Sequence, residues 1–197
     1  MTKDKTDMLL AQYTALRAEI LARIDTRYRL VSYTIVLLGT MIALVIRSEN
    51  PQPSVLFAYP VFAYLLFGLW IQNYRMMNRI SAFMMKHVEP HFDGTWWESF
   101  NLEVGGEPSR VRRILASGHA GALFVVAQVI AMTCGFSAKL STVQDWKIVL
   151  STLSPLDWLW FSVGIFAILA TVVNLCRPSL WGSRDVDVAR IQTSTDS

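Results

Sequence analysis

Long apolar stretches without charge alternate with charged segments along this chain, and the alternation predicts its helices. Four stretches contain no Asp, Glu, Lys or Arg over 17, 21, 25 and 19 residues, and they cover 30–46, 54–74, 114–138 and 158–176. A helix that crosses the ~30 Å hydrocarbon core of a bilayer needs about 20 such residues. The pattern therefore predicts an all-α integral membrane protein with four transmembrane helices.

Helical patterns continue outside the first two spans. Apolar residues recur every three or four positions over residues 8–29, which predicts an amphipathic helix, and no Pro or Gly separates it from the first span. The same periodicity extends the second span to Glu89, where Pro90 disfavours helix in the residue before it. Each helix has one apolar face, so we expect contacts between Leu16, Ile20 and Ile24 on one and Met76, Ile80 and Phe83 on the other.

The last span has a recognisable start. Ser154 is a typical N-cap, Pro155 suits the first helical position, and Asp157 follows three residues after the cap, so we expect this span at 156–176. These elements divide the chain into an amphipathic cytoplasmic helix at 1–29, a transmembrane hairpin at 30–74, a cytoplasmic helical segment at 75–113, a second hairpin at 114–178 and a flexible cytoplasmic tail at 179–197.

Composition and charge narrow the class and set the orientation. Apolar residues make up 53% and charged residues 17%, whereas an average soluble domain has roughly 45–50% and about 25%. These values exclude intrinsic disorder, a nucleic-acid-binding module and most soluble enzymes. Fifteen of the 18 Lys and Arg residues fall in the terminal and middle segments, which the positive-inside rule places in the cytoplasm. We therefore expect a multi-pass protein with both termini cytoplasmic, in contact with the lipid bilayer and without affinity for duplex nucleic acid.

Patterns for catalysis and metal binding are sparse. The sequence has no Gly-x-Ser-x-Gly turn and no P-loop, and the uncharged stretches offer no carboxylate for proteolysis or proton transfer. We therefore expect no enzyme activity, no catalytic residue and no cofactor. His87, Glu89 and His91 have the spacing of a shared metal site, but Pro90 ends the helix between them, which favours ordinary surface residues at a helix end.

Polar and small residues in the spans leave two interpretations open. Gln128 is strongly polar near the middle of the third span, and a buried amide in lipid needs a partner. It either packs inside one four-helix bundle or lines a pore in a symmetric oligomer, with Ser32 and Thr40 as further lining residues. The same span begins with small residues whose spacing allows close helix packing, and these candidates are Ser117, Gly118, Gly121 and Ala122.

Charged residues near the cytoplasmic ends of the spans are candidate gating or headgroup contacts. Arg110, Arg112 and Arg113 form a cluster that is most simply a topology anchor on anionic headgroups, with a dedicated ligand site as the alternative. Glu19 precedes Arg23 by four residues, the order that favours an ion pair on a helix, and Arg27 lies at the level of the headgroups. We expect these six charged residues to contact lipid or to influence gating.

Three stretches carry a resemblance to a known family. They are the segment 19–27, which runs directly into the first span, the sequence Trp-Ile-Gln-Asn-Tyr-Arg at 70–75, and Trp-Trp-Glu-Ser-Phe at 96–100. Together they resemble small four-span proteins of the bacterial inner membrane, some of which are similar to membrane effectors of nucleotide-signalling anti-phage systems of the Hailong type. The resemblance implies a gated ion channel that depolarises the infected cell under control of a soluble partner enzyme or its nucleotide product.

Two functions follow as expectations. The first is a homo-oligomeric, cytoplasmically gated ion channel or pore-forming effector in anti-phage defence. The second is a non-conducting membrane anchor or accessory subunit that docks a soluble cytoplasmic partner. An intramembrane enzyme that uses the three residues around Pro90 is a distant third.

Overall fold

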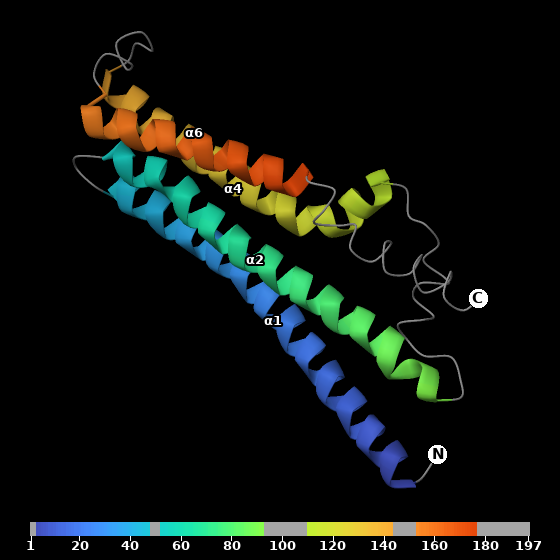
Figure 1. Cartoon of the computed structure of the whole chain (residues 1–197). Helices are drawn as coiled ribbons and strands as arrows, with labels where there is room; N and C mark the ends of the chain where they lie inside the picture. Colours follow the sequence, from blue (N-terminus) through green and yellow to red (C-terminus); the bar gives the residue numbers. More distant parts are fainter. Residues whose placement is uncertain (1–2, 48–51, 93–109, 144–152, 177–197) are drawn as a thin grey trace. The chain divides into compact units, whose positions relative to one another are not determined.

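The computed structural model describes residues 3–47, 52–92, 110–143 and 153–176, and these ranges contain helices and no strand. The elements are α1 (Lys3–Arg47), α2 (Pro53–His87), the short 3-10 helix η1 (Glu89–His91), α4 (Arg110–Val143) and α6 (Pro155–Cys176) (Figure 1).

The four long helices contain candidate membrane spans by length and composition. Their apolar parts lie within Asp4–Arg47, Ser54–His91, Ala120–Leu140 and Pro155–Cys176. The prediction of an all-helical chain with four such helices is confirmed. The orientation of the termini stays a prediction.

The helix ends follow the sequence signals closely. α1 runs unbroken into the first uncharged stretch, as the absence of Pro and of any Gly before Gly39 predicts. α2 passes through Pro60 and ends at His87, within two residues of the predicted end at Glu89. At the start of α6, the Asp157 N–H donates to Ser154 Oγ at 3.2 Å and the Ser154 N–H donates to Asp157 Oδ2 at 3.1 Å. This reciprocal pair confirms the predicted cap.

The chain forms two compact units, and α1, α2 and α4 contribute residues to both. Among the described residues, the first unit contains those up to residue 28 together with 70–92 and 110–116, and the second contains 29–47, 52–69, 117–143 and 153–176. The helical parts expected outside the membrane thus group in one unit, and the four uncharged stretches supply most of the other.

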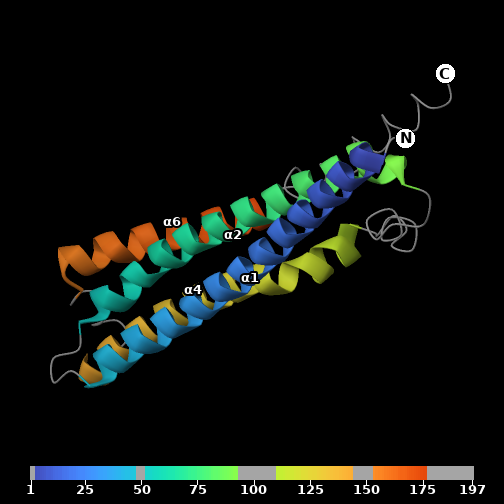
Figure 2. The same cartoon turned by 90° about the horizontal axis from the view of Figure 1, so that it is seen from below.

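In the second unit, α2 and α4 share contacts with both remaining helices (Figure 2). The hydroxyl of Tyr59 donates to the Thr34 carbonyl at 3.0 Å and links α2 to α1. One cluster combines Tyr59, Ala63, Ala127 and Ala131 with Leu37, Leu38 and Met41 of α1, and a second combines Phe57, Met132 and Leu153 with Phe136, Trp160, Phe161 and Ile168.

Phe57 is closely surrounded in this core. It is fully buried, and its ring centroid lies 5.7 Å from that of Phe136 and 5.6 Å from that of Phe161. A Cβ added at Gly135 would lie 2.7 Å from Phe57 Cε1, and one added at Gly164 would lie 3.0 Å from the Phe57 carbonyl oxygen. Gly135 therefore allows α4 to approach this ring, and Gly164 allows α6 to approach the α2 backbone at the same residue.

In the first unit, the structure corrects one predicted packing face. On α1, Ile20 is buried as expected, with Leu16 and Ile24 half-buried. On α2, however, Phe83 is 42% exposed and packs against His87 with 5.1 Å between ring centroids. Met76 and Ile80 are half-buried, and Ser81 and Met84 of α2 and Val88 just beyond its end are buried, so of the three α2 contacts expected here only the one at Phe83 falls on an exposed side chain.

Candidate functional site

A cation and two aromatic rings meet in the first unit. The Cζ atom of Arg27 lies 4.6 Å from the ring centroid of Trp70 and 5.0 Å from that of Tyr74. The two rings stack with 6.1 Å between centroids and 6° between planes, as their i,i+4 spacing on α2 allows. A cation above an aromatic face is stabilised by about 0.5–2 kcal/mol, and more when water is excluded. We call these three residues the Arg27 cluster.

The guanidinium of Arg27 retains hydrogen-bonding capacity. Its Nε atom is buried, and no acceptor lies within hydrogen-bonding distance of it in the part of the chain that the structure describes. The rings contact the group as π faces, while a guanidinium carries five N–H donors. The Arg27 cluster therefore positions a cation without neutralising it.

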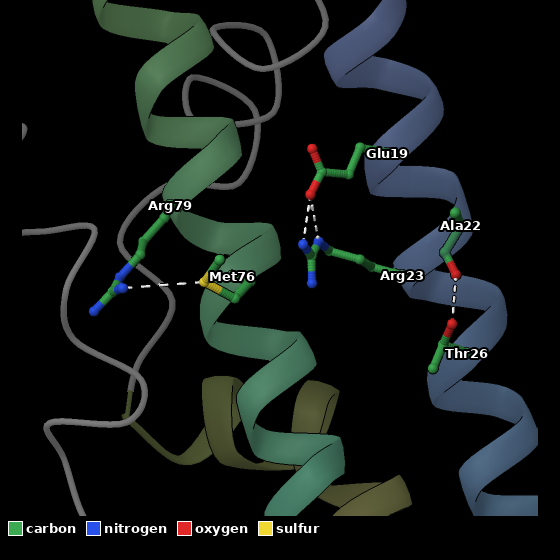
Figure 3. Close-up of polar contacts among 6 residues, drawn as sticks. All are labelled: Glu19, Ala22, Arg23, Thr26, Met76 and Arg79. Atoms are coloured by element: carbon green, nitrogen blue, oxygen red, sulfur yellow. Dashed lines mark hydrogen bonds and ion pairs between the residues drawn. The ribbon is translucent and has the colours of Figure 1, made fainter.

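The carboxylate of Glu19, about two helical turns earlier on α1, is already engaged. Arg23 Nε donates to Glu19 Oε1 at 3.0 Å, which confirms the predicted i,i+4 pair (Figure 3). Nearby, the Thr26 hydroxyl donates to the Ala22 carbonyl at 2.9 Å, and Arg79 Nη1 contacts the Met76 sulfur at 4.0 Å. Arg23 and Arg27 thus lie one turn apart on the same helix but differ in whether an acid balances them.

A second polar cluster lies inside the second unit. Gln128 is fully buried, and its Nε2 donates to Thr171 Oγ1 at 3.0 Å and to the Pro60 carbonyl at 3.3 Å. The Thr171 hydroxyl in turn donates to the Ala167 carbonyl at 2.8 Å. Gln128 Oε1 has no hydrogen-bond partner among the described residues. The side chain therefore joins α4 to α2 and α6 within one copy of the chain.

The interior position of Gln128 does not fit the expectation that it lines a pore between copies. The geometry corresponds to the other interpretation, packing inside one bundle. The remaining pore candidates, Ser32 and Thr40, are exposed on α1, and the Thr40 hydroxyl donates to the Val36 carbonyl at 2.8 Å.

The small residues of α4 separate into two groups. Gly121 is buried, and a Cβ added there would lie 2.6 Å from Leu175 Cδ1, so α4 and α6 approach closely at this point. Ala122 is exposed. Five further candidates belong to α4 by backbone but have side chains outside the described part of the structure, and they are Arg110, Arg112, Arg113, Ser117 and Gly118.

No protein-family model, curated protein or solved structure matches this chain.

The three residues around Pro90 are divided between elements. His87 ends α2, whereas Glu89 and His91 belong to η1. Within the described ranges, no group of three or more His, Cys, Asp or Glu side chains is arranged to hold a metal ion.

Sequence reasoning missed the partners of both polar clusters. Trp70 and Tyr74 were part of the second span, and their i,i+4 spacing at its end was the available signal for a site near Arg27. Thr171 had no comparable signal, because a lone hydroxyl in a span ordinarily bonds to its own helix.

Proposed function

We propose that this chain is a membrane anchor that docks a soluble partner through the helical unit built from the N-terminal half of α1 and the C-terminal part of α2. The observation that carries the proposal is that both helices continue far beyond the uncharged stretches and form a compact unit of their own. A protein that only needed to insert into a bilayer would not require these extensions.

An exposed apolar face on α1 supports a docking role. Leu10 and Leu21 are 50% and 56% exposed, and Tyr28 is 72% exposed. Spacings of 11 and seven residues are close to whole numbers of turns at 3.6 residues per turn, so the three side chains lie on one face, with Thr14 and Arg17 between the first two. Apolar residues aligned in this way outside a span are typical of a surface that receives another helix.

The charge distribution supports a cytoplasmic location for this unit. The segments that build it hold most of the Lys and Arg residues, which disfavour translocation across a membrane. The proposal therefore places the protein in the bacterial inner membrane with its docking unit and both termini in the cytoplasm. A green fluorescent protein fused after Ser197 is expected to fluoresce, because it folds in the cytoplasm and not after export.

Site-specific photo-crosslinking in cells tests the docking role. A benzophenone amino acid at Leu21 is expected to capture a soluble polypeptide, whereas the same group at the neighbouring Ile20, which is 4% exposed, is not. Crosslinks from Leu21 only to lipid or to a second copy of the chain would contradict a soluble partner.

An oligomeric, gated ion channel is the second candidate function, and the exposed face of α1 in the second unit favours it. Ser32, Gly39 and Ala43 share one exposed face, and a Cβ added at Gly39 would meet no atom within 4 Å. Small residues on a span allow a second copy to approach closely. In this proposal several copies would surround a pore with Ser32 and Thr40 near it, and a soluble regulator or nucleotide would gate it during anti-phage defence.

Planar-bilayer recording separates the two candidates. Conductance by the purified protein would favour the channel if Gly39→Leu abolishes it and Gly68→Leu does not. Gly68→Leu is the matched control, since a Cβ at Gly68 also meets no atom within 4 Å. A purified protein that is monomeric and electrically silent would leave only the anchor.

A further inference from the structure

We propose that the Arg27 cluster is a binding site for the phosphate group of an anionic phospholipid. The proposal does not depend on the docked soluble partner, because its ligand is the phosphate of a lipid and its residues are those of the Arg27 cluster. It rests on the unpaired donor, on the charge balance around it, and on where the three residues stand along the two helices.

The first argument is the chemistry of the guanidinium. The group stays charged at any physiological pH, and its planar array of N–H donors matches the oxygens of a phosphate. Trp70 and Tyr74 restrict its position at 4.6 and 5.0 Å from their ring centroids but leave its N–H groups to other acceptors. A phosphate would receive the hydrogen bonds that the rings cannot accept.

The second argument is local charge. Arg23, one turn earlier, has its charge balanced by Glu19, whose Oε1 accepts from Nε at 3.0 Å. Arg27 has no such ion pair among the residues that the structure describes, and its Nε is buried without an acceptor. Burying part of an unbalanced cation is costly, and an anionic ligand removes that cost.

The third argument is position, and it identifies the source of the phosphate. Arg27 lies three residues before the uncharged stretch 30–46, and Trp70 and Tyr74 lie in the last five residues of 54–74. The start of one span and the end of the next face the same side of a bilayer. Trp70 is itself buried in the protein, and it is the place of the three residues at the ends of two spans that puts the Arg27 cluster at the level of the headgroups, so the phosphate available to it is that of a lipid.

Native mass spectrometry of delipidated protein in neutral detergent tests the site. The probes are phosphatidylglycerol, phosphatidylcholine as the zwitterionic comparison, and inorganic phosphate as the soluble source. We expect Arg27→Gln to weaken the tightest phosphatidylglycerol binding about tenfold, the loss of one charge-assisted contact. Arg23→Gln removes the same formal charge one turn away and is expected to change the affinity less than about threefold, as for an already paired residue.

Each outcome decides the proposal. Equal effects of Arg27→Gln and Arg23→Gln on phosphatidylglycerol binding would overturn it, because net charge alone would then explain the affinity. Equal affinity of the wild type for phosphatidylglycerol and phosphatidylcholine would also overturn the anionic-lipid assignment. If inorganic phosphate binds in a way that depends on Arg27 and competes with the lipid, the site would be supported, but its ligand would be a soluble phosphate compound.

Two further variants separate binding from packing. Arg27→Lys keeps the charge but loses the planar donor array, so we expect an intermediate affinity and an unchanged Tm in the absence of lipid. It also serves as the test variant if Arg27→Gln does not fold. Trp70→Phe keeps an aromatic ring beneath the cation. We expect this variant to retain most of the rise in Tm that added phosphatidylglycerol causes in the wild type. A purely structural cluster would instead give an Arg27→Lys variant with a lower Tm in the absence of lipid and an unchanged rise in Tm on addition of phosphatidylglycerol.

Discussion

The side-chain amide of Gln128 in α4 donates a hydrogen bond to the hydroxyl of Thr171 in α6, with 3.0 Å between Nε2 and Oγ1. Both residues are fully buried, and the same amide also reaches the carbonyl of Pro60 in α2. One side chain thus connects three of the helices that contribute to the second unit. Hydrogen bonds of this kind set the rotation of helices whose surfaces are otherwise uniformly apolar.

The Gln128–Thr171 bond predicts a measurable coupling between the two positions. In a double-mutant cycle of Gln128→Leu and Thr171→Val, we expect a coupling of about 0.5–1.5 kcal/mol in the free energy of unfolding, typical of side-chain hydrogen bonds inside membrane proteins. Unfolding in mixed micelles provides the measurement. Thr133→Val is the control partner for Gln128→Leu, because the exposed Thr133 hydroxyl bonds only to its own helix at Val129. Additive effects in the Thr171 cycle would contradict the bond.

Two glycines of similar sequence context are expected to respond oppositely to alanine. Gly135→Ala would place Cβ 2.7 Å from the buried Phe57 ring, and overpacking of this kind costs about 1–3 kcal/mol, so Tm should fall. Gly68→Ala meets no atom within 4 Å, and the gain in helix propensity is about 0.5–1 kcal/mol, so Tm should stay or rise. A thermal-stability assay in detergent measures both. Equal Tm values for the two variants would show that α4 does not approach α2 so closely.

The cap of α6 is expected to contribute to stability. Ser154→Ala removes the acceptor of the Asp157 N–H and should lower the free energy of unfolding by about 0.5–2 kcal/mol. Ser162→Ala changes an exposed residue within the same helix and is the matched control. Unfolding in mixed micelles compares them. If both variants are as stable as the wild type, the reciprocal cap does not stabilise this helix end.

Adjacent residues on α1 are expected to separate packing from docking. Ile20 is 4% exposed, so Ile20→Lys forces a charge into the first unit and should cost on the order of 3 kcal/mol. Leu21 is 56% exposed, and Leu21→Lys should change stability by less than about 0.5 kcal/mol while reducing capture of a docked partner. Tm and crosslinking yield are the two measurements. A stable Ile20→Lys variant would show that this face of α1 is not packed.

The sequence predicts the helices well because their signals are local. Uninterrupted apolar composition places the four candidate spans, the absence of Pro and of early Gly keeps α1 in one piece, and the Ser154–Asp157 pattern starts α6. Each of these depends on residues within a few positions of one another along the chain. Local signals of this kind do not require knowledge of any neighbouring helix.

How each helix is rotated about its axis, and which side chains it brings together with those of its neighbours, are less predictable from the sequence for a physical reason. α4 around Gln128 is apolar on all sides, so hydropathy sets how deep the amide lies but not which neighbour it faces. Arg27 and Trp70 are distant in sequence, and only packing of α1 against α2 brings them to 4.6 Å. Phe83 shows the opposite error, because its place in an apolar periodicity predicted a buried contact, whereas its side chain is 42% exposed and the adjacent Met84 is buried.

The crowding around Phe57 has a consequence for how this chain can diverge. The ring at 57 occupies the space that a side chain would need at position 135, so these two positions are not free to change separately, whereas the space at position 164 is limited by the backbone carbonyl of residue 57. A lineage that acquires a larger residue at 135 must first, or together with it, accept a smaller one at 57. The order in which substitutions become tolerable is thereby constrained by a single aromatic ring.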